Sequence, residues 1–373
     1  MRHPPGRSQG EYRSAQHGGR PVTRVLVTGA AGFIGMHVAL ALLRRGDEVV
    51  GVDDLNGYYD VRLKQARLAR LMAMRGFRFE RVDVADTAAM GACFETHRAD
   101  RVVHLAAQAG VRYSVTHPHA YAQANLVGFL NVLEACRQHE LGHLVYASSS
   151  SVYGGNTKMP FSEHDAVDHP VSLYAATKKA NELMAHSYSH LYRVPTSGLR
   201  FFTVYGPWGR PDMAYFKFAR AILADEPIPV FNHGNMSRDF TYIDDIVHGV
   251  LAVLDAPPAP AEGASGHDVP AGVSTAPYRV LNIGSHAPVP LLDFIGALER
   301  ALGRRARLDL QPMQPGDVPA TCADLSALQA LAGTQHPCLP LEEGVRRFVE
   351  WYREYHAIAA AESATALQEP ACA

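Results

Sequence analysis

The chain has 373 residues, a formal net charge of −2 and 19% charged residues, which is typical of a soluble protein with one large domain or two closely packed ones. No basic stripe indicates a nucleic-acid partner, and no apolar stretch reaches the ~18–20 residues that span a membrane. The five cysteines are scattered and form no C-x-x-C pair. We therefore expect reduced thiols in a cytoplasmic protein without a metal site.

Short β-branched segments alternate with helical patterns in the first half of the chain. We predict strands at 24–28, 48–52, 77–82, 101–105, 144–148 and 196–202. We predict helices at 33–45, 61–74, 119–138 and 173–192, with another ending near 94. Strands rich in Val and Leu that alternate with helices indicate a parallel sheet covered on both faces. The expected fold class is therefore α/β, with a Rossmann-like doubly wound parallel sheet.

After residue 202 the alternation breaks, and prolines separate shorter elements. The predicted helices are 243–254, 291–302 and 341–355, and the predicted strand is 279–283. We expect residues 22–202 to form the nucleotide-binding domain. Residues 203–357 are expected to form mainly a smaller, interleaved C-terminal α/β domain, which binds the substrate and returns segments to the first domain.

Three segments are expected to be flexible. Residues 255–277 are dominated by Pro, Ala, Gly and Ser, which indicates a surface insertion. Residues 1–21 and 358–373 are interpreted as tails. The beginning of the chain is polar and lacks the apolar region of a secretory signal, so no export is expected.

A glycine-rich turn separates the first strand from the first helix. Gly29, Gly32 and Gly35 permit a tight turn, close approach of the backbone to a pyrophosphate and close packing of helix on strand. The N-terminus of the helix adds free N–H groups and a positive dipole end. Such a turn alone is weak evidence, but its position between a strand and a helix favours nucleotide binding.

Acidic and small residues follow the next three strands. An acid at Asp53, the end of the second strand, accepts hydrogen bonds from an adenosine ribose and repels a 2′-phosphate, so NAD is favoured over NADP. The competing interpretation, an exposed loop acid, suits Asp54 better. The residues expected near the adenine and along the cofactor are Asp83, Val84, Leu105, Ala106, Ala107 and Gln108.

Tyr174 and Lys178 are four residues apart in a predicted helix, so their side chains lie on one face. A phenol with a pKa near ~10 is a poor base, and a neighbouring ammonium group would lower that pKa. A hydroxyl from the serine run 148–151, at a strand end, would complete a proton-transfer site. Taken alone, the pair is more often an ordinary contact within an amphipathic helix.

Five segments, in this order, are similar to the extended short-chain dehydrogenase/reductases of the NAD-dependent nucleotide-sugar epimerase and dehydratase family. They are 28–35 (TGAAGFIG), 104–107 (HLAA), 148–154 (SSSSVYG), Tyr174-x-x-x-Lys178 and 238–241 (RDFT). The resemblance extends over residues 22–355. Within this family the segments 53–60, 110–114, 202–214 and 313–318 resemble the UDP-glucuronate 4-epimerases in particular.

The resemblance implies a set of catalytic and cofactor-binding residues. Tyr174 would be the base for the sugar C4 hydroxyl, Lys178 would bind the nicotinamide ribose, and Ser149 would be the third hydroxyl. Ser150 and Ser151 are rivals for that last role. The implied NAD-binding residues are Gly29, Gly32, Phe33, Ile34, Gly35, Asp53, Asn56, Asp83, Val84, Leu105, Ala106, Ala107, Gln108, Asn125, Tyr174 and Lys178.

The resemblance also implies a substrate site for UDP-glucuronate. Thr203 and Arg210 would bind the C6 carboxylate with Ser149, Ser150 or Ser151 nearby, although Arg210 has a rival role at the diphosphate. Arg238 would bind the diphosphate and Asp317 the uridine ribose, and Arg112 would lie at the sugar site or on the loop that covers it. The 4,6-dehydratases carry Asp and Glu where this chain has Ser150 and Ser151, and the galactose epimerases carry Asn at the Thr203 position and Arg at the Gln314 position.

The implied activity is therefore the interconversion of UDP-glucuronate and UDP-galacturonate through a 4-keto intermediate, with bound NAD as cofactor. One alternative is a 4-epimerase of neutral UDP-hexoses or another NAD-dependent enzyme acting on UDP-sugars. A second alternative is a non-catalytic NAD-sensing protein. A homodimer through helices 119–138 and 173–192 is usual in this family and is expected here.

Overall fold

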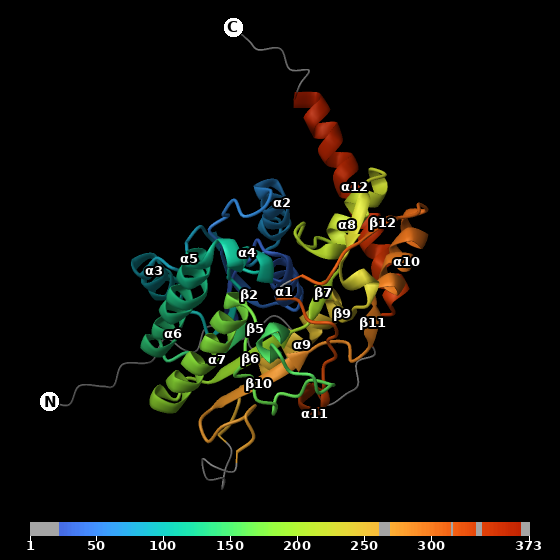
Figure 1. The fold of residues 1–373 in the computed structure, drawn as a ribbon. Helices are drawn as coiled ribbons and strands as arrows, with labels where there is room; N and C mark the ends of the chain where they lie inside the picture. Colours follow the sequence, from blue (N-terminus) through green and yellow to red (C-terminus); the bar gives the residue numbers. More distant parts are fainter. Residues whose placement is uncertain (1–21, 261–268, 315, 333–337, 367–373) are drawn as a thin grey trace, which may run out of the picture.

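The computed structural model describes residues 22–260, 269–314, 316–332 and 338–366, with side chains up to residue 357 (Figure 1). The predicted tail 1–21 and residues 367–373 lie outside the described residues. In the described part of the chain, no helix is long and apolar enough to cross a membrane.

A seven-stranded sheet in the order β10-β6-β5-β4-β1-β2-β3 forms the centre of the molecule, and every pair in it is parallel. This confirms the predicted α/β fold with a Rossmann-like sheet. The strand order reverses at β1, so the crevice between β1 and β4 is a topological switch point. The bounds are β1 Arg24–Thr28, β2 Glu48–Val52, β3 Phe77–Glu80, β4 Arg101–His104, β5 His143–Ser149, β6 Thr196–Phe201 and β10 Tyr278–Ile283.

Helices cover both faces of this sheet, because alternate residues of its strands point in opposite directions. Val25 and Val27 pack with α1 and α9, whereas Leu26 packs with α3, α6 and α7. The helices of the first half are α1 Phe33–Arg44, α2 Val61–Met72, α3 Thr87–His97, α4 Val111–Thr116, α5 Pro118–Tyr121, α6 Gly128–Gln138 and α7 Leu173–Tyr192, with a 3₁₀ turn, η2, at Ser150–Tyr153.

The predicted helix 119–138 contains a change of helix type. Its middle, Ala122–Val127, is a π-helical segment (η1) between α5 and α6. Such segments are rare and are frequent at functional sites, because the extra residue per turn redirects side chains. Here it carries Asn125, which is discussed below.

The second half adds two small sheets and five helices to the described part of the chain. The sheets have the orders β11-β9-β7 and β12-β8. Because β10 joins the large sheet instead, the two halves are interleaved. The bounds are β7 Thr203–Tyr205, α8 Ala214–Leu223, β8 Pro227–Val230, η3 Phe231–Gly234, β9 Ser237–Tyr242, α9 Ile243–Asp255, β11 Pro288–Pro290, α10 Leu291–Leu302, β12 Arg307–Leu310, α11 Ser326–Ala332 and α12 Leu341–Ala366.

Two predicted boundaries differ from the structure. Helix α12 was expected to end near 355 but continues to Ala366, and its last turns extend away from the body (Figure 1). Its end is rich in alanine, the residue that favours helix most. The predicted flexible insertion 255–277 is also wrong at its C-terminal end: the side chain of Ala276 is fully buried, and the N–H of Val280 bonds the Gly272 carbonyl oxygen at 2.8 Å. Residues 261–268 lie outside the described part.

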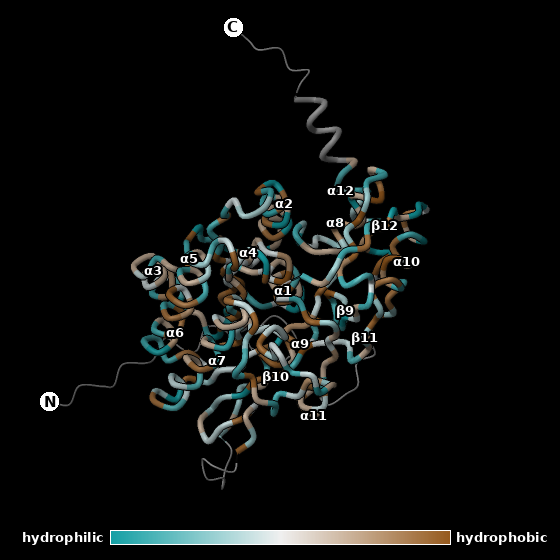
Figure 2. Tube along the Cα trace, viewed as in Figure 1, coloured by the Kyte–Doolittle hydropathy of each residue, from teal (hydrophilic) through white to brown (hydrophobic). Residues whose placement is uncertain are grey.

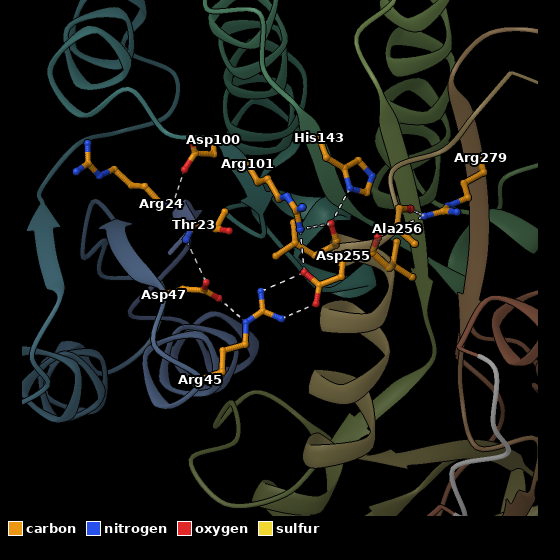
Figure 3. Close-up of polar contacts among 12 residues, drawn as sticks. Thr23, Arg24, Arg45, Asp47, Asp100, Arg101, His143, Asp255, Ala256 and Arg279 are labelled. Atoms are coloured by element: carbon orange, nitrogen blue, oxygen red, sulfur yellow. Dashed lines mark hydrogen bonds and ion pairs between the residues drawn. The ribbon is translucent and has the colours of Figure 1, made fainter. Parts of the chain in front are cut away.

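The two halves meet where α1 packs against α9, and most residues of these two helices are hydrophobic (Figure 2). At the amino ends of the strands, a polar cluster holds the end of α9 (Figure 3). Asp255 accepts hydrogen bonds from Arg45 at 2.7 and 3.3 Å and from Arg101 at 2.8 Å. Burial lowers the pKa of His143 to about 3, so its neutral ring donates from Nδ1 to the Leu254 carbonyl oxygen at 3.1 Å.

A buried ion pair supports the strand that carries the serine run. Arg200 of β6 donates two hydrogen bonds to Glu182 of α7, at 2.8 and 2.9 Å, and the Ser148 hydroxyl donates a third at 2.6 Å. The side chains of Arg200 and Glu182 are 3% and 2% exposed. A charge buried this deeply is tolerated only while its partner is present.

Replacing Glu182 by alanine should therefore lower the free energy of unfolding by about 3–5 kcal/mol, because the Arg200 guanidinium would remain buried without its counter-charge. Equilibrium urea unfolding measures this loss. Glu350→Ala is the matched control, since Glu350 pairs with Arg346 on the exposed face of α12. Similar losses in the two variants would contradict the importance of the buried pair.

Candidate active site

A cavity of about 430 Å³ lies at the carboxyl ends of β1, β4, β5 and β6, where open α/β sheets bind their ligands. Most of the predicted site residues line it. They are Gly29, Gly32, Phe33, Ile34, Gly35, Asp53, Asn56, Asp83, Val84, Leu105, Ala106, Ala107, Gln108, Ser149, Ser150, Ser151, Tyr174, Lys178, Thr203 and Arg210. Asn125, Arg112, Arg238 and Asp317 do not line it.

The glycine turn leaves room for backbone but not for side chains. Gly29 has a φ of +70°, and a Cβ there would lie 2.8 Å from the Ala106 nitrogen. A Cβ on Gly35 would lie 2.0 Å from the Gly29 carbonyl oxygen. The first helix begins at Phe33 without a side-chain cap, and its first residues line the cavity. Their backbone N–H groups can therefore donate hydrogen bonds to a phosphate.

Asp53 is buried at the end of β2 and is oriented by the backbone. Its Oδ2 accepts a hydrogen bond from the Ala31 N–H at 3.0 Å, and its Oδ1 accepts one from the Leu55 N–H at 2.9 Å. Burial raises the pKa of this carboxyl. A carboxylate keeps further acceptor sites after two such bonds, so Asp53 fits the ribose of an adenine dinucleotide.

Lys64 lies beside this acid and was missed from the sequence. Its Nζ donates to the Asn56 side-chain oxygen at 2.9 Å, and its charge acts on Asp53 and Asp54. Burial lowers the pKa of Lys64. In the sequence it is one more lysine of an amphipathic helix, so only its position in the first turn of the helix after the 53–60 loop could have indicated the site.

Asn125 was predicted to contact the cofactor, but the structure gives its amide other partners. Its oxygen accepts a hydrogen bond from the Gln108 N–H at 2.8 Å, and its nitrogen donates to the Gln108 carbonyl and to Thr177 Oγ1, both at 3.0 Å. It therefore holds the segment after β4 in place. The Gln108 amide nitrogen is buried against Tyr121 without a hydrogen bond of normal geometry, and Gln108 lines the cavity, so this group fits an incoming polar ligand.

Tyr174, Lys178 and Ser149 meet at one end of the cavity. The Lys178 Nζ donates to the Ala147 carbonyl oxygen at 2.8 Å, and burial lowers the pKa of this lysine to about 8. Burial raises the pKa of Tyr174, opposed by a hydrogen bond between Tyr174 and Ser149 and by the positive charge of Arg210. The pKa of this phenol is therefore raised, whereas the sequence predicted that Lys178 would lower it, and Lys178 is not among the groups that act on this pKa.

The serine run favours Ser149 as the hydroxyl nearest the base. Ser149 interacts with Tyr174, and its Oγ donates to Ser151 Oγ at 3.1 Å and accepts from the Ser151 N–H at 3.2 Å. The 3₁₀ turn beginning at Ser150 produces this arrangement. Ser150 and Ser151 also line the cavity, next to it in the chain.

Arg210 follows β7 and is fixed by an acid that the sequence interpretation did not include. Its Nε donates to Asp212 Oδ1 at 3.0 Å and its Nη2 donates to Asp212 Oδ2 at 2.5 Å. The Tyr58 hydroxyl donates to the same carboxylate at 3.3 Å. The remaining nitrogen, Nη1, has no hydrogen bond to the residues that the structure describes, and Arg210 lines the cavity.

The other predicted substrate residues form a separate cluster. Arg112 Nη2 lies 3.2 Å from Asp317 Oδ2, and its guanidinium lies over the Phe231 ring at 4.5 Å. Burial lowers the pKa of Arg238, while the charge of Asp317 raises it. Arg112 follows Gly110 and Val111, which line the cavity, so this cluster lies next to its wall.

Two histidine pairs, His139 with His143 and His186 with His190, have a spacing that also occurs in metal sites. The His143 ring is buried and bonds to Leu254 and Ser197. His186 bonds to the Ser274 hydroxyl at 2.9 Å. In the described part of the chain, no group of three or more His, Cys, Asp or Glu side chains is arranged to hold a metal ion.

Comparison with known proteins gives consistent matches. The model of the NAD dependent epimerase/dehydratase family matches residues 25–272. A probable UDP-glucuronate 4-epimerase of Rhizobium meliloti (strain 1021) is 51% identical over 330 residues, which cover 88% of this chain and 96% of that protein.

Two solved structures extend the comparison to the fold. The UDP-glucuronic acid 4-epimerase from Bacillus cereus, in complex with UDP-glucuronic acid and NAD, has a TM-score of 0.79 at 33% identity and covers 89% of this chain and 99% of that one. The UDP-glucose 4-epimerase from Thermotoga maritima, with UDP-glucose, has a TM-score of 0.76 at 28% identity, with the same coverage.

The buried lysine gives a prediction with a definite pH dependence. Burial lowers the pKa of Lys178 in the folded protein from the usual 10.5 to about 8. Below pH 8 the buried charge therefore lowers the free energy of unfolding by its full amount, and this destabilisation decreases as the pH rises from 8 to 10.5. Lys178→Met should therefore raise the free energy of unfolding at pH 7 by roughly 1–3 kcal/mol. The loss of the hydrogen bond to the Ala147 carbonyl oxygen reduces this gain. Urea unfolding at pH 7 and pH 9 should show a smaller gain at pH 9; an equal gain would contradict the account.

Proposed function

Because the chain belongs to the NAD-dependent epimerase/dehydratase family, we propose that it is a 4-epimerase that interconverts UDP-glucuronate and UDP-galacturonate. The observation that carries this proposal is the meeting of Tyr174, Ser149 and Arg210 at one end of the cavity. A base, a hydroxyl donor and a guanidinium group are the groups required to deprotonate C4 of a sugar that bears a C6 carboxylate.

The cavity fits NAD as the bound cofactor. The glycine turn and the start of α1 would hold the pyrophosphate, and Asp53, Asn56 and Lys64 would surround the adenosine ribose. Asp83 and Val84 would contact the adenine. When bound, NAD would supply a reversible acceptor for the hydride of the sugar C4.

Tyr174 supplies the base for this reaction. Its phenolate removes the proton from the C4 hydroxyl, while the Ser149 hydroxyl donates a hydrogen bond to the same C4 oxygen. Since burial raises the pKa of Tyr174, its ionisation depends on positive charge in the site, and Arg210 already provides part of that charge. Lys178, held by Ala147 at the end of β5, is placed for the nicotinamide ribose. On the return step Tyr174 gives the proton back to the C4 oxygen.

Epimerisation is favoured over elimination because Ser150 and Ser151 are hydroxyl residues and not acids. Ser150 and Ser151 stand where an acid pair would be needed to remove water across C5 and C6. Hydroxyl groups can hold the sugar by hydrogen bonds, but at neutral pH they are too weakly acidic or basic for that elimination. The 4-keto intermediate therefore turns over in the site and is reduced again.

The C6 carboxylate would be bound by Arg210 and Thr203, with Ser150 or Ser151 beside them. Support comes from Arg210 Nη1, because Asp212 bonds to the other two nitrogens of the guanidinium group and not to this one. Arg238 and Asp317 would bind the diphosphate and the uridine ribose, and Arg112 would lie at the sugar site or on the loop that covers it. These assignments place the acidic end of the sugar next to the catalytic base.

The same geometry supports one alternative substrate class. Asp212 neutralises Arg210, so the net charge of this pair is zero before any substrate enters. Because this pair carries no net charge, the site could also accept a neutral UDP-hexose, with the same base and hydroxyl. The two functions share the mechanism and differ only at C6.

A homodimer is also proposed. Helices α6 and α7 lie side by side (Figure 1) and expose apolar side chains, with Leu183 57% and Leu191 65% exposed. Leu130, at 42%, adds to this face. Pairing with the same helices of a second copy would bury them in a four-helix interface.

Purified protein should convert UDP-glucuronate to UDP-galacturonate without added cofactor, as followed by proton NMR of the C4-inverted product. Tyr174→Phe should lower the rate by about 10²–10⁴-fold, because the phenylalanine ring cannot take the C4 proton. The variant should still bind UDP-glucuronate in a calorimetric titration. A Tyr174→Phe enzyme with near-normal turnover would exclude this mechanism.

Arg210→Met tests the carboxylate role. The ratio of kcat/KM for UDP-glucuronate to that for UDP-glucose should fall by about tenfold or more, since a charge-assisted hydrogen bond contributes roughly 1.5–3 kcal/mol. Lys217→Met, on α8 near Asp212, is the control and should keep the ratio. Equal losses on both substrates in Arg210→Met would instead support the diphosphate role.

A further inference from the structure

The loop before Arg210 has a backbone that its sequence does not favour. Gly206 has a φ of +143°, and Trp208 has a φ of +64°, a left-handed conformation that is disfavoured for a bulky residue. A Cβ on Gly209 would lie 2.0 Å from the Tyr215 hydroxyl oxygen. Since Arg210 follows directly, the conformation of residues 206–209 determines where its guanidinium lies.

Arg67 of α2 holds this loop by its carbonyl groups. Its Nε and Nη2 donate to the Trp208 oxygen at 3.0 and 2.6 Å, and Nη2 also donates to the Gly209 oxygen at 3.0 Å. Its Nη1 donates to the Ala31 carbonyl oxygen at 3.2 Å and to the Tyr59 hydroxyl at 2.6 Å. These bonds use all five N–H groups of a guanidinium.

The environment of Arg67 is unusual for a charged side chain. It is 0% exposed, and each of these bonds ends on a neutral oxygen. Burying a cation among neutral acceptors is less favourable than pairing it with a carboxylate. Arginine suits this position because it has five N–H donors in one rigid plane, and no other side chain has that many.

The three segments belong to different parts of the active site. Ala31 is in the glycine turn, and its N–H is held by Asp53, so this peptide unit is fixed on both sides. Tyr59 is in the loop that follows β2. Trp208 leads to Arg210. Arg67 therefore connects the proposed cofactor turn to the proposed carboxylate ligand.

Neighbouring contacts hold the same loop from the side. Burial lowers the pKa of His37 to about 4, so its ring is neutral. Its Nε2 lies 3.1 Å from the Pro207 carbonyl oxygen. The Arg70 guanidinium lies 5.1 Å from the centre of the Trp208 ring, which also contacts Trp351 of α12. Arg70 and Trp351 fix the Trp208 side chain, whereas His37 and Arg67 bond the backbone that leads to Arg210.

We propose that Arg67 is a positioning residue for substrate selection: by bonding the carbonyl oxygens of Trp208 and Gly209 to the glycine turn, it holds Arg210 where the C6 carboxylate of a UDP-uronate lies. This role rests on the proposed function. It makes selection of the acidic sugar depend on a residue that touches neither substrate nor cofactor.

The test compares Arg67→Lys with the unaltered protein on two substrates. Lysine keeps the positive charge, but its single nitrogen has three donors and cannot reproduce the five planar bonds of Arg67, so Arg210 should lose its position. We expect KM for UDP-glucuronate to rise and the kcat/KM ratio of UDP-glucuronate to UDP-glucose to fall by about tenfold or more, because small displacements of a ligand group have large effects. Thermal unfolding and the amount of NAD retained per chain verify that the variant is folded.

Arg70→Met is the matched control, since Arg70 lies on the same helix and contacts the same tryptophan but bonds no carbonyl group of the loop. It should keep the selectivity ratio. Arg67→Gln is the second variant, which retains a planar donor, and it should show the same fall in ratio if the lysine variant is poorly folded. An unchanged ratio in the folded variants would overturn the proposal.

The unaltered protein separates this proposal from the proposed function. If it turns over UDP-glucuronate and Arg67→Lys loses activity on both substrates equally, Arg67 has only a structural role and the further inference fails. If the unaltered protein binds NAD but turns over no UDP-uronate, the proposed function fails first. Calorimetric binding of UDP-glucuronate and UDP-glucose to both forms then shows whether Arg67 affects selection of the acid.

Discussion

The active site depends on the adjacency of β1 and β4 at the centre of the parallel sheet. The strand order reverses there, so the glycine turn after β1 and the segment after β4 lie against each other without intervening side chains. Gly29 approaches Ala106 so closely that no Cβ fits between them. The next strand along, β5, then places Ser149 and the Ala147 carbonyl at the same edge, and α7 returns Tyr174 and Lys178 to them.

Much of this arrangement could be predicted from the sequence, because its elements are long and their patterns are local. The buried strands and covering helices of the first half have the expected periodicities, and the glycine turn and Asp53 occupy fixed positions relative to them. The short strands β7, β8, β9, β11 and β12 could not be predicted in this way. They have three to six residues and depend on partners far away in the chain.

The polar residues that were missed have a common reason. Lys64 and Arg67 lie on a helix whose lysines and arginines look like an ordinary solvent-exposed face, yet both are buried. Asp212 lies two residues after Arg210, and only the folded loop shows that its carboxylate occupies two nitrogens of that guanidinium. Sequence patterns indicate which groups can do chemistry. They do not show which charges are already paired, and here that pairing changes the electrostatics of the site.

Charge in this site is therefore arranged by position more than by amount. Arg210 is neutralised by Asp212, Lys178 bonds to a backbone oxygen, and the pKa of Tyr174 remains raised by burial. Under the proposed function, selection of an acidic sugar would then depend on the direction of the Arg210 N–H groups, which follows from the conformation of residues 206–209. The specificity of such a site depends on the geometry of one loop. A substitution that displaces this loop should therefore reduce specificity while the protein remains folded.

The central claim is that one hydride leaves C4 and returns to the same carbon within a closed site. The most direct test is turnover of UDP-glucuronate that carries deuterium at C4, in ordinary water and with no added cofactor. The account predicts that UDP-galacturonate keeps the deuterium at C4, as seen by mass spectrometry and NMR. Loss of the label to solvent during turnover would contradict it.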